Sequence, residues 1–161
     1  MTEKDCVLEK IVWSDDDFAA MGWHDSQIHA VSFVPDSGEL VFDLDYILKW
    51  VGQGSAEPFR FWVAPATLVF KNVFGMEGCL GFHQGMPETP TILGITQSTT
   101  DPSELRALHK WAYRIEFDQG ELTFNANGFC QFFRHHPVLC DSQQLGSEER
   151  GGISFDRPTL L

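Results

Sequence analysis

A seven-residue motif, D-x-G-E-L-x-F, occurs twice in this chain and constrains its fold more than any other feature. The first copy occupies residues 36–42 and the second occupies residues 118–124. Alternating apolar and polar residues lead into and out of each copy, with a short Asp/Gly turn between the two runs. This pattern is typical of a β-hairpin, in which Gly38 and Gly120 supply the positive φ of the turn. The sequence therefore predicts two hairpins.

Further strand-like segments surround the two hairpins. They are residues 59–71, interrupted by Pro65, residues 91–97 and residues 129–134. Because proline cannot donate to a strand ladder, we expect Pro65 at a corner, a bulge or a sheet edge. About seven short strands with frequent Gly and Pro predict a mainly β fold, built as an antiparallel sheet, a sandwich or an open barrel.

Two short helices are expected beside the strands. Residues 14–21 begin with Ser14 as the N-cap, followed by acidic residues at the positive end of the helix dipole. Residues 101–109 begin with a capping Asp and a Pro at the first helical position. Residues 72–90 are rich in glycine and predict a loop or an irregular edge, and residues 146–161 suggest a mobile tail.

Length and composition predict a single domain over residues 1–161. At 43% hydrophobic residues, the chain can bury a core that needs neither a metal nor a disulfide for stability. The 4 cysteines are never in a CxxC spacing, so we expect reduced thiols and no cofactor bound through them. The N-terminal residues lack an apolar signal and no apolar run is long enough for a bilayer, which predicts a cytoplasmic protein without membrane contact.

The chain is strongly acidic, with 11 Lys and Arg residues, 23 Asp and Glu residues and a net charge of −12. Binding to nucleic acid requires a positive surface, and the basic residues here are scattered along the sequence. We therefore expect no nucleic-acid partner. An acidic surface instead attracts basic proteins.

A polar cluster precedes the first hairpin and is the strongest candidate for chemistry. His24, Asp25 and His29 belong to it, and Asp43 and Asp45 lie on the returning strand. The hairpin brings His29 opposite this pair of carboxylates, and a His/Asp group can hold a divalent metal or transfer protons near neutral pH. Against this, adjacent His24 and Asp25 point to opposite faces of an extended strand. Asp43 and Asp45 on an outward face are most simply solvated.

The second hairpin carries Asn125 and Asn127 where the first has Asp43 and Asp45, which favours a polar outer face over a required negative charge. We therefore interpret the histidines mainly as structural hydrogen-bonding groups. The catalytic alternative uses His24, Asp25 and His29, and the metal alternative uses His24, His29, Asp43 and Asp45. The neighbouring His135 and His136 diverge on an extended chain and are expected at an exposed strand end.

Residue types that dominate binding energetics define a predicted interaction surface, since Trp, Tyr and Arg are enriched at interfaces. Its members are Asp43, Asp45, Tyr46, Trp50, Arg60 and Trp62. The first hypothesis for function is therefore a non-enzymatic, immunity-like or regulatory domain that binds a protein partner, with a basic partner favoured by charge. One alternative is a metal-assisted or acid–base enzyme built on the His/Asp cluster. The other is a homo-oligomer subunit that pairs through edge strands near Pro65.

Four stretches of the sequence resemble a family of small uncharacterised bacterial proteins. They are WHDSQIH at 23–29, LDYILKW at 44–50, FWVAPATLVF at 61–70 and FCQFFR at 129–134. The resemblance covers residues 20–140 and implies a bacterial protein without assigning an activity or site residues. In size, charge and compartment the chain is also similar to small acidic immunity proteins.

Overall fold

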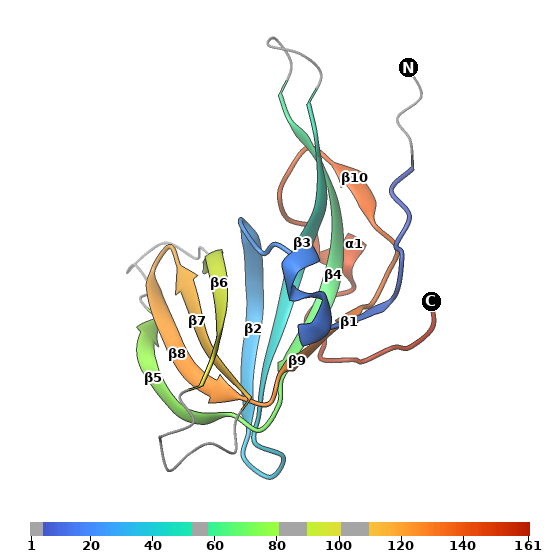
Figure 1. Cartoon of the computed structure of the whole chain (residues 1–161). Coiled ribbons are helices and arrows are strands. Elements are labelled where there is room, and N and C mark those ends of the chain that lie inside the picture. Colours follow the sequence, from blue (N-terminus) through green and yellow to red (C-terminus); the bar gives the residue numbers. More distant parts are fainter. Residues whose placement is uncertain (1–4, 53–57, 81–89, 101–109) are drawn as a thin grey trace.

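A computed structural model describes residues 5–52, 58–80, 90–100 and 110–161 (Figure 1). In chain order, the strands are β1 (Val12–Ser14), β2 (Ser26–Val34), β3 (Glu39–Val51), β4 (Arg60–Phe70), β5 (Phe74–Leu80), β6 (Thr91–Thr99), β7 (Trp111–Phe117), β8 (Gly120–Ala126), β9 (Phe129–Phe133) and β10 (Val138–Cys140). The two short helices are η1 (Asp15–Ala20), a 3-10 helix, and α1 (Ser147–Arg150).

All strands belong to a ten-stranded antiparallel sheet with the order β1-β9-β4-β3-β2-β6-β7-β8-β5, and β10 pairs with β4. Strands make up 55% of the described residues and helices 7%, and the described sheet is not closed into a barrel. The predicted mainly β fold is therefore confirmed. No helix in the described ranges is long and apolar enough to cross a membrane.

Both predicted hairpins are present and have the expected turns. β2 pairs with β3 from Val34 opposite Glu39, and β7 pairs with β8 from Phe117 opposite Gly120. The backbone of Gly38 has φ +65° and that of Gly120 has φ +137°. Glycine adopts positive φ with the least strain, so the local sequence favours chain reversal at both positions.

Pro65 lies inside β4, where the sequence predicted a corner, a bulge or an edge. The strand continues through it, paired with β3 along its whole length. On its other side β4 changes neighbour at the proline: Val63 pairs with β10, whereas Ala66 pairs with β9. The missing N–H of Pro65 thus falls at the gap between the two ladders, which is how an interior strand tolerates it. The free edge expected there for oligomer formation is absent from the described sheet.

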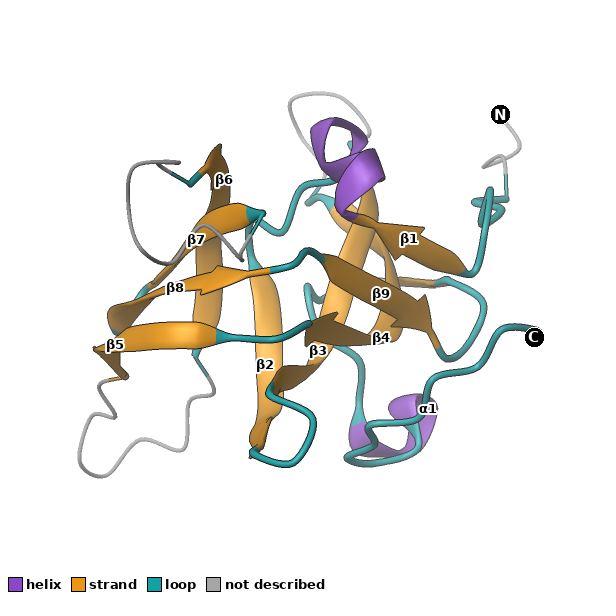
Figure 2. Cartoon of the chain, turned by 60° about the horizontal axis from the view of Figure 1, so that its bottom comes forward, coloured by secondary structure: helices purple, strands orange, loops and turns teal. Residues whose placement is uncertain are grey.

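The sheet curls around its main hydrophobic core, as Figure 2 shows. We call the core side the inner face and the opposite side of β3 and β4 the back face. Alternation along β3 places Phe42, Leu44 and Tyr46 on the inner face, packed against residues of β4, β7, β8 and β9. Ile47 belongs instead to a smaller cluster on the back face.

Three sequence expectations outside the hairpins have different outcomes. The helix expected at residues 14–21 is present as η1, whereas the helix expected at residues 101–109 lies outside the described residues. Residues 74–80, expected to be a loop or an irregular edge, form β5 at the sheet edge. All 4 cysteines are free thiols.

The sequence suggested a mobile tail over residues 146–161, but this segment returns to the sheet as far as Arg157. We call residues 145–158 the C-terminal strap. Leu145 is buried with Ile47, Phe61 and Val63 of the back face, and Arg150 at the end of α1 is 3% exposed. The strap covers the back face because its polar groups find partners there, as described next.

Candidate functional site

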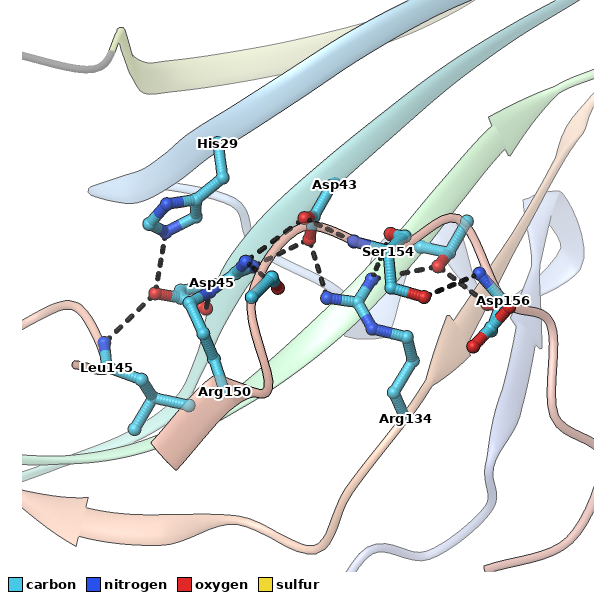
Figure 3. Close-up of polar contacts among 10 residues, drawn as sticks. His29, Asp43, Asp45, Arg134, Leu145, Arg150, Ser154 and Asp156 are labelled. Carbon is cyan, nitrogen blue, oxygen red and sulfur yellow. Dashed lines mark hydrogen bonds and ion pairs between the residues drawn. The ribbon is translucent and has the colours of Figure 1, made fainter. Parts of the chain in front are cut away.

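The buried charged residues of the described structure lie between the back face and the C-terminal strap (Figure 3). Asp43 and Asp45 point to this side of β3, and both are 0% exposed. Arg134 follows β9, and Arg150 comes from α1. We call these residues the four-charge cluster. Its formal charges, two negative and two positive, cancel.

Asp43 is saturated with hydrogen bonds. Its Oδ1 accepts from Nη2 of Arg134 and from Nη2 of Arg150, both at 2.6 Å. Its Oδ2 accepts from Nη1 of Arg150 at 3.1 Å and from the backbone N–H of Ser154 at 3.0 Å. Burial raises the pKa of the Asp43 carboxyl, but the bonds from Arg150 and Arg134 outweigh burial, so this pKa lies below its ordinary value.

The carboxylate of Asp45 contacts three residues, two from the C-terminal strap and one from β2. Its Oδ1 accepts from Nε of Arg150 at 3.2 Å, and its Oδ2 accepts from the backbone N–H of Leu145 at 2.9 Å. Nε2 of His29 lies 2.9 Å from the same Oδ2. His29 lies at a register shift between Ile28 and Ala30, and its ring contacts Asp45 on the back face. The expectation that His29 approaches a carboxylate across the hairpin is therefore confirmed.

Arg134 joins the cluster to the end of the strap. Its Nη1 donates to Oγ1 of Thr67 and to the backbone oxygen of Ser154, both at 2.9 Å. The Thr67 hydroxyl then donates to the backbone oxygen of Asp156 at 2.7 Å. Buried ions of this kind are retained only when their hydrogen bonds are made, so the cluster fastens the strap to the sheet.

The burial of Asp43 and Asp45 corrects the sequence interpretation. They were expected on a solvated outer face and in an exposed binding surface, and both side chains are instead covered by the strap. Strand alternation placed them correctly on one side of β3, but it carried no information about the segment that covers that side. The sequence analysis did not identify Arg150 as a partner of these carboxylates, because no local motif surrounds it.

His24 and Asp25 do meet, contrary to expectation. Nδ1 of His24 lies 3.0 Å from Oδ2 of Asp25, and Nε2 of Gln143 donates to the same oxygen at 3.0 Å. Neighbouring side chains diverge only on extended backbone, whereas Asp25 has φ +65°. His24 is exposed and His29 contacts Asp45, so the two histidines belong to different pairs.

No group of three or more His, Cys, Asp or Glu side chains suited to a metal ion occurs among the described residues. The oxygens of Asp43 and Asp45 already accept protein N–H groups. These contacts support a structural role for the cluster more than metal chemistry. His135 and His136 are both exposed, as expected from their place after β9.

A second site of interest lies where β3 and β4 extend beyond the other strands (Figure 1). Trp50 is 46% exposed and Phe59 is 56% exposed, whereas Phe61 beneath them is 8% exposed. The Trp50 ring packs edge-on against both phenylalanines, with centroid distances of 5.0 Å to Phe61 and 5.8 Å to Phe59. We call these three residues the aromatic end of the hairpin.

The other residues of the predicted interaction surface are divided between core and surface. Tyr46 is 8% exposed, and its hydroxyl accepts from the backbone N–H of Gly22 at 2.9 Å, so it belongs to the core. Arg60 is half-buried and donates from Nε to Asp141 at 2.9 Å. Trp62 is also half-buried. Thus Trp50, Arg60 and Trp62 retain solvent access near the projecting end.

Comparisons with protein-family models, with curated proteins and with solved structures each find no match. The resemblance to a bacterial family therefore stays a prediction. The fold and the site together define a mainly β protein with one curled antiparallel sheet, whose back face is closed by its own C-terminal strap through buried ion pairs.

Proposed function

We propose that this chain is a non-enzymatic, immunity-like or regulatory domain of the bacterial cytoplasm that binds a protein partner through the aromatic end. The observation that carries the proposal is the exposure of Trp50 and Phe59 side by side on a projecting hairpin. Large aromatic side chains contribute most of the binding energy in many interfaces. Contiguous exposed aromatic surface on a folded protein is a common mark of such an interface.

The aromatic end is also held in place before any partner arrives. The buried Phe61 supports the Trp50 ring from below. A Cβ at Gly52 would lie 2.8 Å from the ring of Phe59, so glycine at this position lets that ring lie against the strand. Anchors that are already ordered lose little conformational entropy on binding.

Charge favours a basic partner. The four-charge cluster has no net charge, so the formal charge of −12 resides on the remaining residues of the chain. An acidic surface accelerates association with a basic protein, and salt screens this attraction. The aromatic end would then supply the contact that persists at higher salt.

The proposal is tested by capture of partners from a lysate of the source cells, with the full chain tagged at its N-terminus and eluted along a salt gradient. We expect one prominent basic protein that is lost with Trp50→Ala and with Phe59→Ala. Phe33→Ala is the matched control, because Phe33 is also aromatic and is 47% exposed, but on β2. A capture that the three variants affect equally would contradict the proposal.

A further inference from the structure

We propose that the C-terminal strap can be exchanged between two copies of this chain, with Arg150 of each copy entering the Asp43–Asp45 site of the other. The resulting dimer would be reciprocal and two-fold symmetric. This inference does not depend on a partner at the aromatic end, because it rests on the contacts of the strap with Asp43 and Asp45. The two sites meet at Phe61, which packs against Leu145 of the strap.

The contacts that hold the strap run between the strap and the sheet. On the sheet side they involve two carboxylates of β3, a hydroxyl of β4 and the guanidinium after β9. On the strap side they involve Leu145, Arg150, Ser154 and Asp156. The same strap from a second copy can make each of these contacts, since they require only the two complementary surfaces.

An open strap leaves a site that strongly favours a guanidinium group. Without the strap, Asp45 loses the N–H groups of Leu145 and Arg150, and Asp43 loses those of Arg150 and Ser154. A partly buried carboxylate that loses its hydrogen-bond donors raises the free energy of the protein. A planar guanidinium can donate hydrogen bonds to both carboxylates at once. The segment seen to fit this site is the strap, so the strap of a second copy is the partner that we propose.

Opening the strap disturbs little of the hydrophobic core. Ile153 is 65% exposed and Phe155 is 37% exposed, and Leu145 is the apolar strap residue packed in the back-face cluster. The main core on the inner face contains no strap residue. Segments that bury few apolar side chains open at lower free energy than the core strands beneath them.

Residues 141–144 provide a suitable hinge between β10 and the strap. Three of these four residues are exposed, and Gln143 is half-buried against Asp25. Fully extended, four residues span about 13 Å. A short exposed connection of this kind is where exchange of identical elements between copies takes place.

The test uses two full-length variants, each of which breaks one half of the cluster: Asp43→Asn on the sheet and Arg150→Ala on the strap. Neither closed monomer has an intact cluster. In an exchanged heterodimer, the strap of the Asp43→Asn copy meets the unaltered sheet of the Arg150→Ala copy, and one cluster is restored. We expect mixing to enrich the heterodimer at least about tenfold over dimers of either variant alone. Native mass spectrometry and light scattering measure it.

The matched control replaces Arg150→Ala with Arg157→Ala. Arg157 also lies in the strap, where it pairs with Glu39 at 2.8 Å on the surface. The closed Arg157→Ala monomer already has an intact four-charge cluster. Exchange of straps with the Asp43→Asn copy therefore adds no further intact cluster, and we expect no enrichment of the heterodimer. A mixture that stays monomeric, or a heterodimer that forms equally in the control, would overturn the proposal.

A measurement on the unaltered chain covers the case in which a variant does not fold. Isotopically light and heavy protein are mixed at high concentration, held briefly in acid to protonate Asp43, and returned to neutral pH. We expect mixed dimers that form only after the acid step. Monomer at every concentration, or dimers that form equally without acid, would contradict strap exchange.

Discussion

Asp43 is a buried charge whose hydrogen bonds offset the loss of its contact with water. Its side chain is fully buried, yet it receives four N–H groups from three residues. Burial lowers the pKa of the Arg150 guanidinium, but the hydrogen bonds that it donates to Asp43 and the nearby charge of Asp45 raise this pKa above its ordinary value. Each ion therefore depends on the other, and removing one partner leaves an uncompensated buried charge.

Replacement of Asp43 by Asn is expected to lower the free energy of unfolding by about 3–5 kcal/mol, because Arg134 loses its ion pair with Asp43 while Arg150 keeps the one with Asp45. Urea denaturation of the full chain measures the change. Asp141→Asn is the control, since Asp141 pairs with Arg60 but its side chain is 87% exposed. The control is expected to stay within about 0.5 kcal/mol of the unaltered chain, and equal losses would contradict the assigned role.

The same residue predicts a dependence of stability on pH. Because the folded pKa of Asp43 is lowered, its contribution is complete above the unfolded pKa, about 3.9, and is lost as pH falls through the folded pKa. The unfolded chain binds the proton first, so stability rises with pH across this window. Urea midpoints measured from about pH 2 to pH 6 are expected to depend less on pH in Asp43→Asn than in Asp141→Asn.

Gly120, at the start of β8, has no room for a side chain. A Cβ at this position would collide with the backbone oxygen of Cys79 on β5, and φ is +137°. Gly120→Ala is therefore expected to cost roughly 1–3 kcal/mol in the free energy of unfolding. Gly94→Ala on β6 is the control, because its Cβ would meet nothing within 4 Å. An equal effect of both substitutions on thermal unfolding would argue against the steric explanation.

For the molecule as a whole, the strap and the core are expected to open separately. The amides of Leu145 and Ser154 both donate to cluster carboxylates, so a single opening exposes both to hydrogen exchange. Arg150→Ala is expected to accelerate exchange at both amides about a hundredfold while amides of β4 at Leu68 keep their protection. Exchange that increases equally at Leu68 would show that strap and sheet open as one unit.

The hairpins and the His29–Asp45 contact were predictable because their causes are local. Strand alternation has a period of two, and a turn of known length sets which residues face each other. The projecting aromatic residue Trp50 could also be singled out by its type. In contrast, the positive φ of Asp25 depends on its surroundings, since an aspartate adopts this conformation only where the fold requires it.

By itself, the sequence determined the mainly β class, the two hairpins and the side of β3 on which Asp43 and Asp45 lie. Only the tertiary structure decided that this side is buried. Leu145 and Arg150, which cover it, are 100 residues or more away along the chain from their carboxylate partners. Alternation records which residues share a face, whereas the burial of that face depends on a distant segment that returns to it.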